Sequence, residues 1–178
     1  NHKVLYKLPD FHIVYTAIGR RGIAESRLYR RSPFVVFAED VNSQPPGLRV
    51  DIEIESPEKY KLTIEAYDYE GEHAFGEHFT GYGFDFYIYP RHKEESPYEE
   101  GGSNRYYFYF VRPATLANIY RSKLSVTPVE EEATLVTLSV TGPVPEQEAD
   151  YLDSLMASYL ELGLDWKNQA AEQTINFI

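Results

Sequence analysis

Residues 50–66 read VDIEIESPEKYKLTIEA, and this stretch decides the fold. Val50, Ile52 and Ile54 alternate with acidic residues, and the alternation resumes at Tyr60 after the connection Ser56–Lys59. A period of two places apolar side chains on one face of a β-strand and polar side chains on the other. The stretch therefore predicts an antiparallel β-hairpin.

The same kind of pattern extends on both sides of this hairpin. Further alternating or apolar runs lie at residues 11–18, 34–38, 84–89 and 106–110. The chain contains 16 Tyr and 10 Phe, and aromatic side chains favour half-buried strands. Turn residues at 42–47 and an acidic loop at 92–103 separate the runs. We therefore expect an antiparallel sandwich or a curled sheet over most of residues 10–112.

The pattern changes after Pro113. Residues 114–123 predict a helix with Leu116, Ile119 and Tyr120 on one face, and residues 136–140 predict a strand. Apolar residues at helical spacing then predict one long helix from Pro145 onward. Gly163 interrupts that helix, and we expect it to mark a break or a tight packing contact.

The expected fold class is α+β. An antiparallel, aromatic-rich β module covers residues 1–105, and a β-α-β-α portion covers residues 106–178. The chain begins without Met and stops at Ile178 within the helical pattern. We therefore expect a piece of a longer protein, with the long helix cut short.

Composition limits the possible functions. The 178 residues carry a net charge of −11, which argues against nucleic-acid binding and against attachment to anionic membranes through basic patches. With 43% hydrophobic residues the chain is long enough to bury a core. There is no cysteine, which excludes disulfides, thiolate metal sites and a cysteine nucleophile. No apolar run approaches the ~20 residues that cross a bilayer.

Motifs for catalysis or metal binding are weak. Residues 71–79 contain a doubled Gly-Glu-His unit, but His73 and His78 are five positions apart and face opposite sides of a regular strand. We interpret the unit as a polar hairpin edge with surface histidines. Asp51, Glu53 and Glu55 share a strand face, which we interpret as solvated. No phosphate-binding loop or nucleophile elbow is present, so we predict no catalytic, cofactor or metal site and no enzymatic activity.

Two surfaces are candidates for binding. Tyr87, Tyr89, Tyr107 and Tyr109 lie opposite the Phe-rich sides of their strands and are a possible glycan or assembly face. Cross-strand pairing, which needs no ligand, is the alternative interpretation of these tyrosines. On the long helix the expected packing face is Leu152, Leu155, Met156 and Tyr159, either against the protein's own sheet or against other molecules.

The end of the chain also shows a resemblance. Residues 133–178 read ATLVTLSVTGPVPEQEADYLDSLMASYLELGLDWKNQAAEQTINFI. This stretch resembles the Wzz-type polysaccharide chain-length determinants and, more closely, the polysaccharide co-polymerases fused to bacterial tyrosine autokinases. Residues 25–34 and 106–126 are similar to other segments of that family. The residues that match the family motif are Pro145, Ala149, Tyr151, Leu152, Leu155, Tyr159, Lys167, Asn168, Ala170, Thr174, Ile175, Phe177 and Ile178.

The resemblance implies a periplasmic segment of an inner-membrane protein. Members of the family self-associate, act with a polysaccharide polymerase on the glycan chain, and help to set the length of exported capsular polysaccharide or exopolysaccharide. Their membrane helices and any cytoplasmic kinase domain would lie outside this chain, and no cofactor is implied. The alternatives are a sugar-acting hydrolase or lyase, a carbohydrate-binding β module, and a purely structural spacer.

Overall fold

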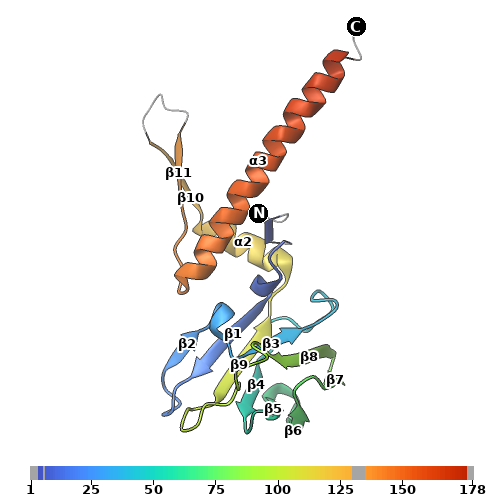
Figure 1. Ribbon diagram of the computed structural model, residues 1–178, viewed down its shortest axis with the longest axis vertical. Coiled ribbons are helices and arrows are strands. Elements are labelled where there is room, and N and C mark those ends of the chain that lie inside the picture. The colour runs from blue at the N-terminus through green and yellow to red at the C-terminus, as the bar shows by residue number, and fades with distance from the viewer. Residues whose placement is uncertain (1–3, 6, 130–134, 176–178) are drawn as a thin grey trace. The chain divides into compact units, whose positions relative to one another are not determined.

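The computed structural model describes Val4, Leu5 and residues 7–129 and 135–175, with the side chains of the last helix described as far as Gln169. The chain forms two compact units (Figure 1). One is Pro9–Leu116, and the other combines Asn1–Leu8 with Ala117–Ile178.

The unit Pro9–Leu116 is a β-sandwich built from two antiparallel sheets. The large sheet has the strand order β2 (Glu25–Arg27), β1 (Ile13–Ile18), β9 (Arg105–Phe110), β4 (Val50–Ile54), β5 (Lys59–Ile64) and β6 (Tyr69–Ala74). The small sheet has the order β3 (Phe34–Phe37), β8 (Phe84–Pro90) and β7 (His78–Gly81). Short 3-10 turns occupy Pro9–Phe11, Tyr29–Arg31 and Glu65–Tyr67. The predicted α+β class and the hairpin β4–β5, in which Ile54 faces Tyr60, are confirmed.

The core lies between the two sheets. The alternate residues that the pattern assigned to the inner faces of β4, β5, β8 and β9 are buried, apart from Tyr106 of β9, which is half-buried. Each strand turns one side toward the opposite sheet. Phe86 meets Phe108 edge to face, with ring centroids 5.4 Å apart. The backbone N–H of Val36 donates to the Tyr15 hydroxyl at 3.0 Å, and burial raises the pKa of Tyr15 to about 12.

The second unit contains a helix pair and a two-stranded hairpin. Helix α2 (Pro113–Lys123) leads into it, and β10 (Ser125–Pro128) then pairs antiparallel with β11 (Val136–Ser139). Helix α3 (Pro145–Ile175) follows. The rings of Tyr120 and Tyr151 lie 4.3 Å apart and join α2 to α3. No helix in the described residues has both the length and the apolar character needed to cross a membrane.

Several features differ from the expectations. The structure divides at residues 116 and 117 rather than after residue 105, because β9 is an inner strand of the large sheet. Strand β10 was missed, because its sequence SVTP lacks apolar alternation. On α2, Leu116 and Tyr120 are buried but Ile119 is 41% exposed.

Gly163 also differs from its expected role. Helix α3 runs through this position, and a Cβ atom built on Gly163 would have nothing within 4 Å. It is therefore neither a helix break nor a tight contact. An isolated glycine inside a helix is tolerated at a cost of about 1 kcal/mol.

Candidate functional site

The four candidate tyrosines lie on two separate surfaces. Tyr107 and Tyr109 belong to β9 and point away from the core on the large sheet, whereas Tyr87 and Tyr89 do so on the small sheet. In a sandwich the outer faces of the two sheets point in opposite directions. The four residues therefore do not form one continuous platform.

Guanidinium groups cover the two tyrosines of the large sheet. The Arg49 guanidinium carbon lies 4.0 Å from the centre of the Tyr107 ring, and the Tyr107 hydroxyl donates to Glu25 Oε2 at 2.8 Å. Arg27 lies 5.5 Å from the centre of the Tyr109 ring, and its Nη2 donates to the Tyr109 hydroxyl at 2.9 Å. The interactions are cation–π contacts, and they occupy ring faces that a sugar would otherwise stack on.

The tyrosines of the small sheet pack against their neighbours. The His78 ring stacks on Tyr87 with centroids 4.4 Å apart and planes 8° apart, and Tyr87 and Tyr89 are 6.0 Å apart. His78 Nε2 also lies 2.7 Å from Asp85 Oδ1. Phe37, opposite Tyr87 on β3, is 53% exposed. This face has the cross-strand pairs that stabilise a sheet, together with the exposed aromatic side chain of Phe37.

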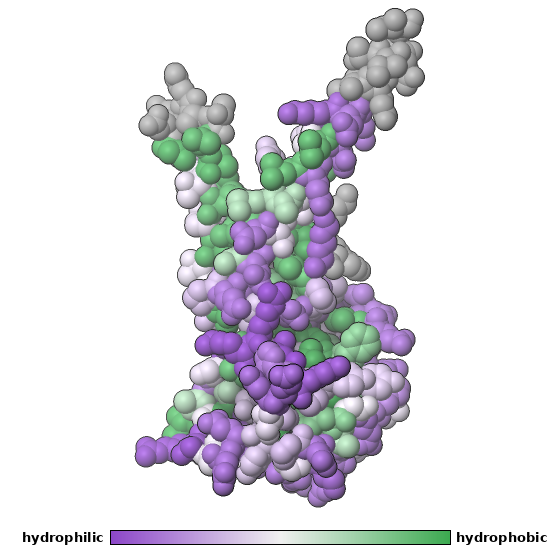
Figure 2. All heavy atoms as spheres, in the orientation of Figure 1, coloured by the Kyte–Doolittle hydropathy of each residue, from purple (hydrophilic) through white to green (hydrophobic). Residues whose placement is uncertain are grey.

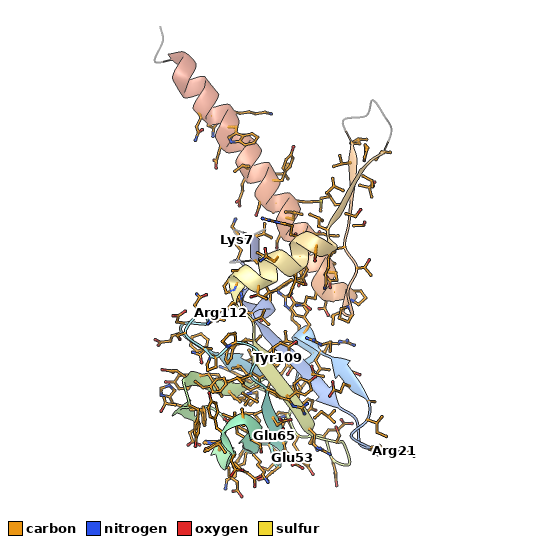
Figure 3. All side chains as sticks on the ribbon, turned by 180° about the vertical axis from the view of Figure 1, so that it is seen from behind. Lys7, Arg21, Glu53, Glu65, Tyr109 and Arg112 are labelled. Carbon is orange, nitrogen blue, oxygen red and sulfur yellow. The ribbon has the colours of Figure 1, made fainter. Side chains whose placement is uncertain are left out.

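A shallow pocket of about 310 Å³ lies on the large sheet beside Tyr107. Arg49, Asp51, Glu65 and Ala66 line it, and we call it the large-sheet pocket. Asp51 is on the outward side of β4, Arg49 immediately precedes that strand, and Glu65 begins the 3-10 turn after β5. Figure 3 labels Glu65, Glu53 and Tyr109, which mark this sheet. The sequence interpretation did not include Arg49 or Glu65, because they are far apart in sequence and only the pairing of β4 with β5 brings them together.

Arg49 is the fixed centre of this pocket. Its Nε donates to both oxygens of Asp51 at 2.9 and 3.0 Å, and its Nη2 donates to Oδ1 at 2.6 Å. The hydrogen bonds to Asp51 raise the pKa of Arg49. Arg49 Nη1 lies 3.8 Å from Glu25 Oε1. A bidentate ion pair of this kind orients both partners.

Two other acidic residues of the large sheet lie beside basic residues of neighbouring strands. Glu53 of β4 lies opposite Lys61 of β5 and Arg105 of β9. Lys61 Nζ is 2.6 Å from Glu70 Oε1, a hydrogen bond that raises the pKa of Lys61. Opposite charges on neighbouring strands stabilise a solvent-facing sheet. The pattern supports the interpretation of the acidic strand face as solvated.

The two histidines of the Gly-Glu-His unit are not brought together. His78 is on the outer face of the small sheet, but His73 is nearly buried at the edge of the large sheet, so the prediction of two surface histidines is wrong for His73. Tyr60 and Phe79 pack against the His73 ring, and Nε2 lies 2.9 Å from the Tyr69 hydroxyl. The two strands also belong to different sheets and are not a hairpin.

The described residues show no preformed metal centre. No group of three or more His, Asp or Glu side chains within them is placed to hold a metal ion. The backbone N–H of Ala74 donates to Glu77 Oε2 at 2.9 Å and lowers the pKa of Glu77. A general acid in sugar hydrolysis needs the opposite shift.

Only part of the predicted face of α3 is covered. Leu152 and Leu155 are half-buried, whereas Met156 and Tyr159 are 48% and 74% exposed. The buried residues at the start of the helix are Val144, Glu148 and Tyr151, which lie on a side that is rotated from the predicted face. Ala149 is exposed.

Large apolar residues stay exposed further along α3. Figure 2 shows hydrophobic residues on both the hairpin β10–β11 and this helix. The exposed set on the helix comprises Met156, Tyr159, Leu160, Leu162, Leu164 and Trp166, and we call it the α3 apolar surface. The side chains of Ala170, Thr174, Ile175, Phe177 and Ile178, which carried part of the resemblance, lie outside the described residues.

The chain was also compared with known proteins. No protein-family model matches it, and no curated protein matches it either.

Proposed function

We propose that this chain is a non-enzymatic periplasmic segment of an inner-membrane polysaccharide co-polymerase. Its role would be to assemble with other copies and so help to control the length, and the export, of capsular polysaccharide or exopolysaccharide. Residues 133–178 support the proposal through their resemblance to that family. The polysaccharide polymerase and the glycan chain are the other proposed partners.

The α3 apolar surface is the observation that carries the proposal. Leu160, Leu164 and Trp166 are between 62% and 66% exposed on a helix of 31 residues. Soluble monomers rarely leave a run of large apolar side chains in water, and such a run usually marks a contact surface. Met156, Leu160 and Leu164 are spaced four residues apart and share one side of the helix, and such a side is suited to pairing with a second helix.

A sugar-acting hydrolase is the rival proposal, and the large-sheet pocket is what favours it. The pocket contains two carboxylates, Asp51 and Glu65. However, Asp51 already accepts three hydrogen bonds from Arg49, so this carboxylate is held by its neighbour and does not face the second carboxylate freely. The geometry therefore supports a binding or assembly role better than hydrolysis.

Cysteine cross-linking in the whole protein tests the proposal. These 178 residues contain no cysteine, so Leu164→Cys gives this segment one reactive thiol on the exposed helix. Under mild oxidation in membranes we expect disulfide-linked dimers from this variant. The control, Glu72→Cys, places an exposed thiol on the edge strand β6 and should give few. Equal cross-linking of both variants would contradict assembly through α3.

A second measurement connects assembly to function. Leu160→Glu combined with Leu164→Cys should lose the cross-links, and the double variant Leu160→Glu/Leu164→Glu should change the length distribution of the exported polysaccharide on a gel. Asp165→Glu, an exposed change on the same helix, serves as the control. An unchanged length distribution in the double variant would refute the role in chain-length control.

A further inference from the structure

The large-sheet pocket has a preorganised polar wall. Arg49 is held from two directions, by the hydrogen bonds to Asp51 and by the Tyr107 ring 4.0 Å away. Tyr107 is held in turn by its hydrogen bond to Glu25. Polar groups that are already fixed lose little entropy when a ligand binds. A ligand that enters the pocket therefore meets hydrogen-bonding groups that lose little further conformational entropy.

The polar groups of the pocket match a polyhydroxylated ligand. A guanidinium has five N–H donors, and the geometry with Asp51 leaves part of this fork available to other acceptors. The carboxylates of Asp51 and Glu65 are acceptors on the wall of the same hollow. Neighbouring hydroxyls of a sugar ring can both donate and accept, so a single ring can satisfy both kinds of group. A volume of about 310 Å³ is at the lower end for small-molecule sites.

The local charge selects among sugars. One cation, Arg49, is surrounded by three carboxylates, those of Glu25, Asp51 and Glu65. The local excess of negative charge repels an anionic ligand at close range. A polyanionic glycan is therefore disfavoured, and a neutral sugar is accepted.

We propose that the large-sheet pocket binds a neutral sugar unit of a polysaccharide, with Arg49, Asp51 and Glu65 hydrogen-bonding to its hydroxyls. This site is separate from the exposed tyrosines of the small sheet. The proposal extends the proposed function, because it names the surface on which the segment meets the glycan. Binding is weak, in the millimolar range, because the pocket is shallow and open to water.

Titration of the chain with defined oligosaccharides tests this site. Cellohexaose, maltohexaose and isomaltohexaose are the neutral probes, and a hyaluronan hexasaccharide is the anionic probe. The readout is the amide ¹H–¹⁵N shifts of Arg49, Asp51, Glu65 and Ala66. We expect saturable shifts with at least one neutral probe at millimolar concentration and none with hyaluronan. No shift with any neutral probe, or equal shifts with hyaluronan, would overturn the proposal.

Variants locate the binding. Glu65→Gln changes an exposed side chain and should weaken binding about fivefold or more, as the loss of one charged hydrogen bond predicts. The matched control Glu72→Gln, also exposed on the large sheet, should leave it unchanged. Binding that is lost in Tyr89→Ala but kept in Glu65→Gln would move the site to the small sheet and overturn the proposal.

The result of the sugar titration is independent of the result of the cross-linking test. The sugar titration reads out the β-sandwich, whereas the cross-linking of Leu164→Cys reads out α3. Assembly without sugar binding would overturn this inference alone. Sugar binding without assembly would overturn the role of α3 and leave a carbohydrate-binding β module.

Discussion

Replacing Gly142 by Ala should destabilise the helical unit through a single clash. A Cβ atom on Gly142 would overlap with Glu148 Oε1 and Cδ, although Cβ atoms essentially never approach other atoms closer than 3.0 Å. The Glu148 carboxylate must therefore leave its place. Glu148 is 5% exposed, and its Oε1 accepts a hydrogen bond from Lys123 Nζ at 3.2 Å.

The loss in free energy of unfolding can be estimated from the buried pair of Glu148 and Lys123. Breaking a fully buried ion pair costs about 3–5 kcal/mol. The Lys123 side chain is 31% exposed, so water recovers part of this loss, and we expect about 2–3 kcal/mol. The backbone of Gly142 is not in the left-handed region, so Ala adds no strain of its own.

Urea unfolding followed by circular dichroism measures this effect in a double-mutant cycle. In a Glu148→Ala background the carboxylate is already absent, so Gly142→Ala should change the free energy of unfolding by less than about 0.5 kcal/mol. Gly163→Ala is the control, since nothing lies near its Cβ, and should stabilise the chain by about 0.4–1 kcal/mol. An equal loss from Gly142→Ala in both backgrounds would refute the clash with Glu148.

Three further predictions concern the β-sandwich. Phe86→Ala, which removes a fully buried ring between the two sheets, should lower the free energy of unfolding by about 3–5 kcal/mol in urea titrations; a loss below 1 kcal/mol would contradict the packing. Tyr15→Phe leaves the buried N–H of Val36 without its acceptor and should cost about 1–3 kcal/mol by thermal unfolding, whereas an exposed control, Tyr67→Phe, should not. The lowered pKa of Glu77 in the folded chain means that its stabilisation is complete above the pKa of the unfolded carboxyl, about 4.3, and is lost as the pH falls through the folded value. The difference in stability between the wild type and Glu77→Gln should therefore be constant from pH 7 to about pH 5 and shrink below about pH 4, and a difference that grows in acid would be inconsistent with this sign.

The α3 helix shows where sequence reasoning succeeds and where it stops. Its start at Pro145 follows from local signals, namely a proline in the first turn with Glu146 and Glu148 nearby. The position of its buried stripe does not follow from local signals. The stripe contains the polar residue Glu148, whose partner Lys123 comes from another helix. A search for apolar spacing selects Met156 and Tyr159 instead, and both are exposed.

By itself the sequence determined the strands with clear alternation and most of their inner-face residues. Alternation along β4, β5, β8 and β9 is a local property of the chain, and a period of two has one structural meaning. The tertiary structure alone decided which outer residues meet. The stacking of Arg49 on Tyr107, the pocket shared with Glu65, and the separation of Tyr87 from Tyr107 all depend on strand order and register. Long-range strand pairing sets both, and no local pattern encodes it.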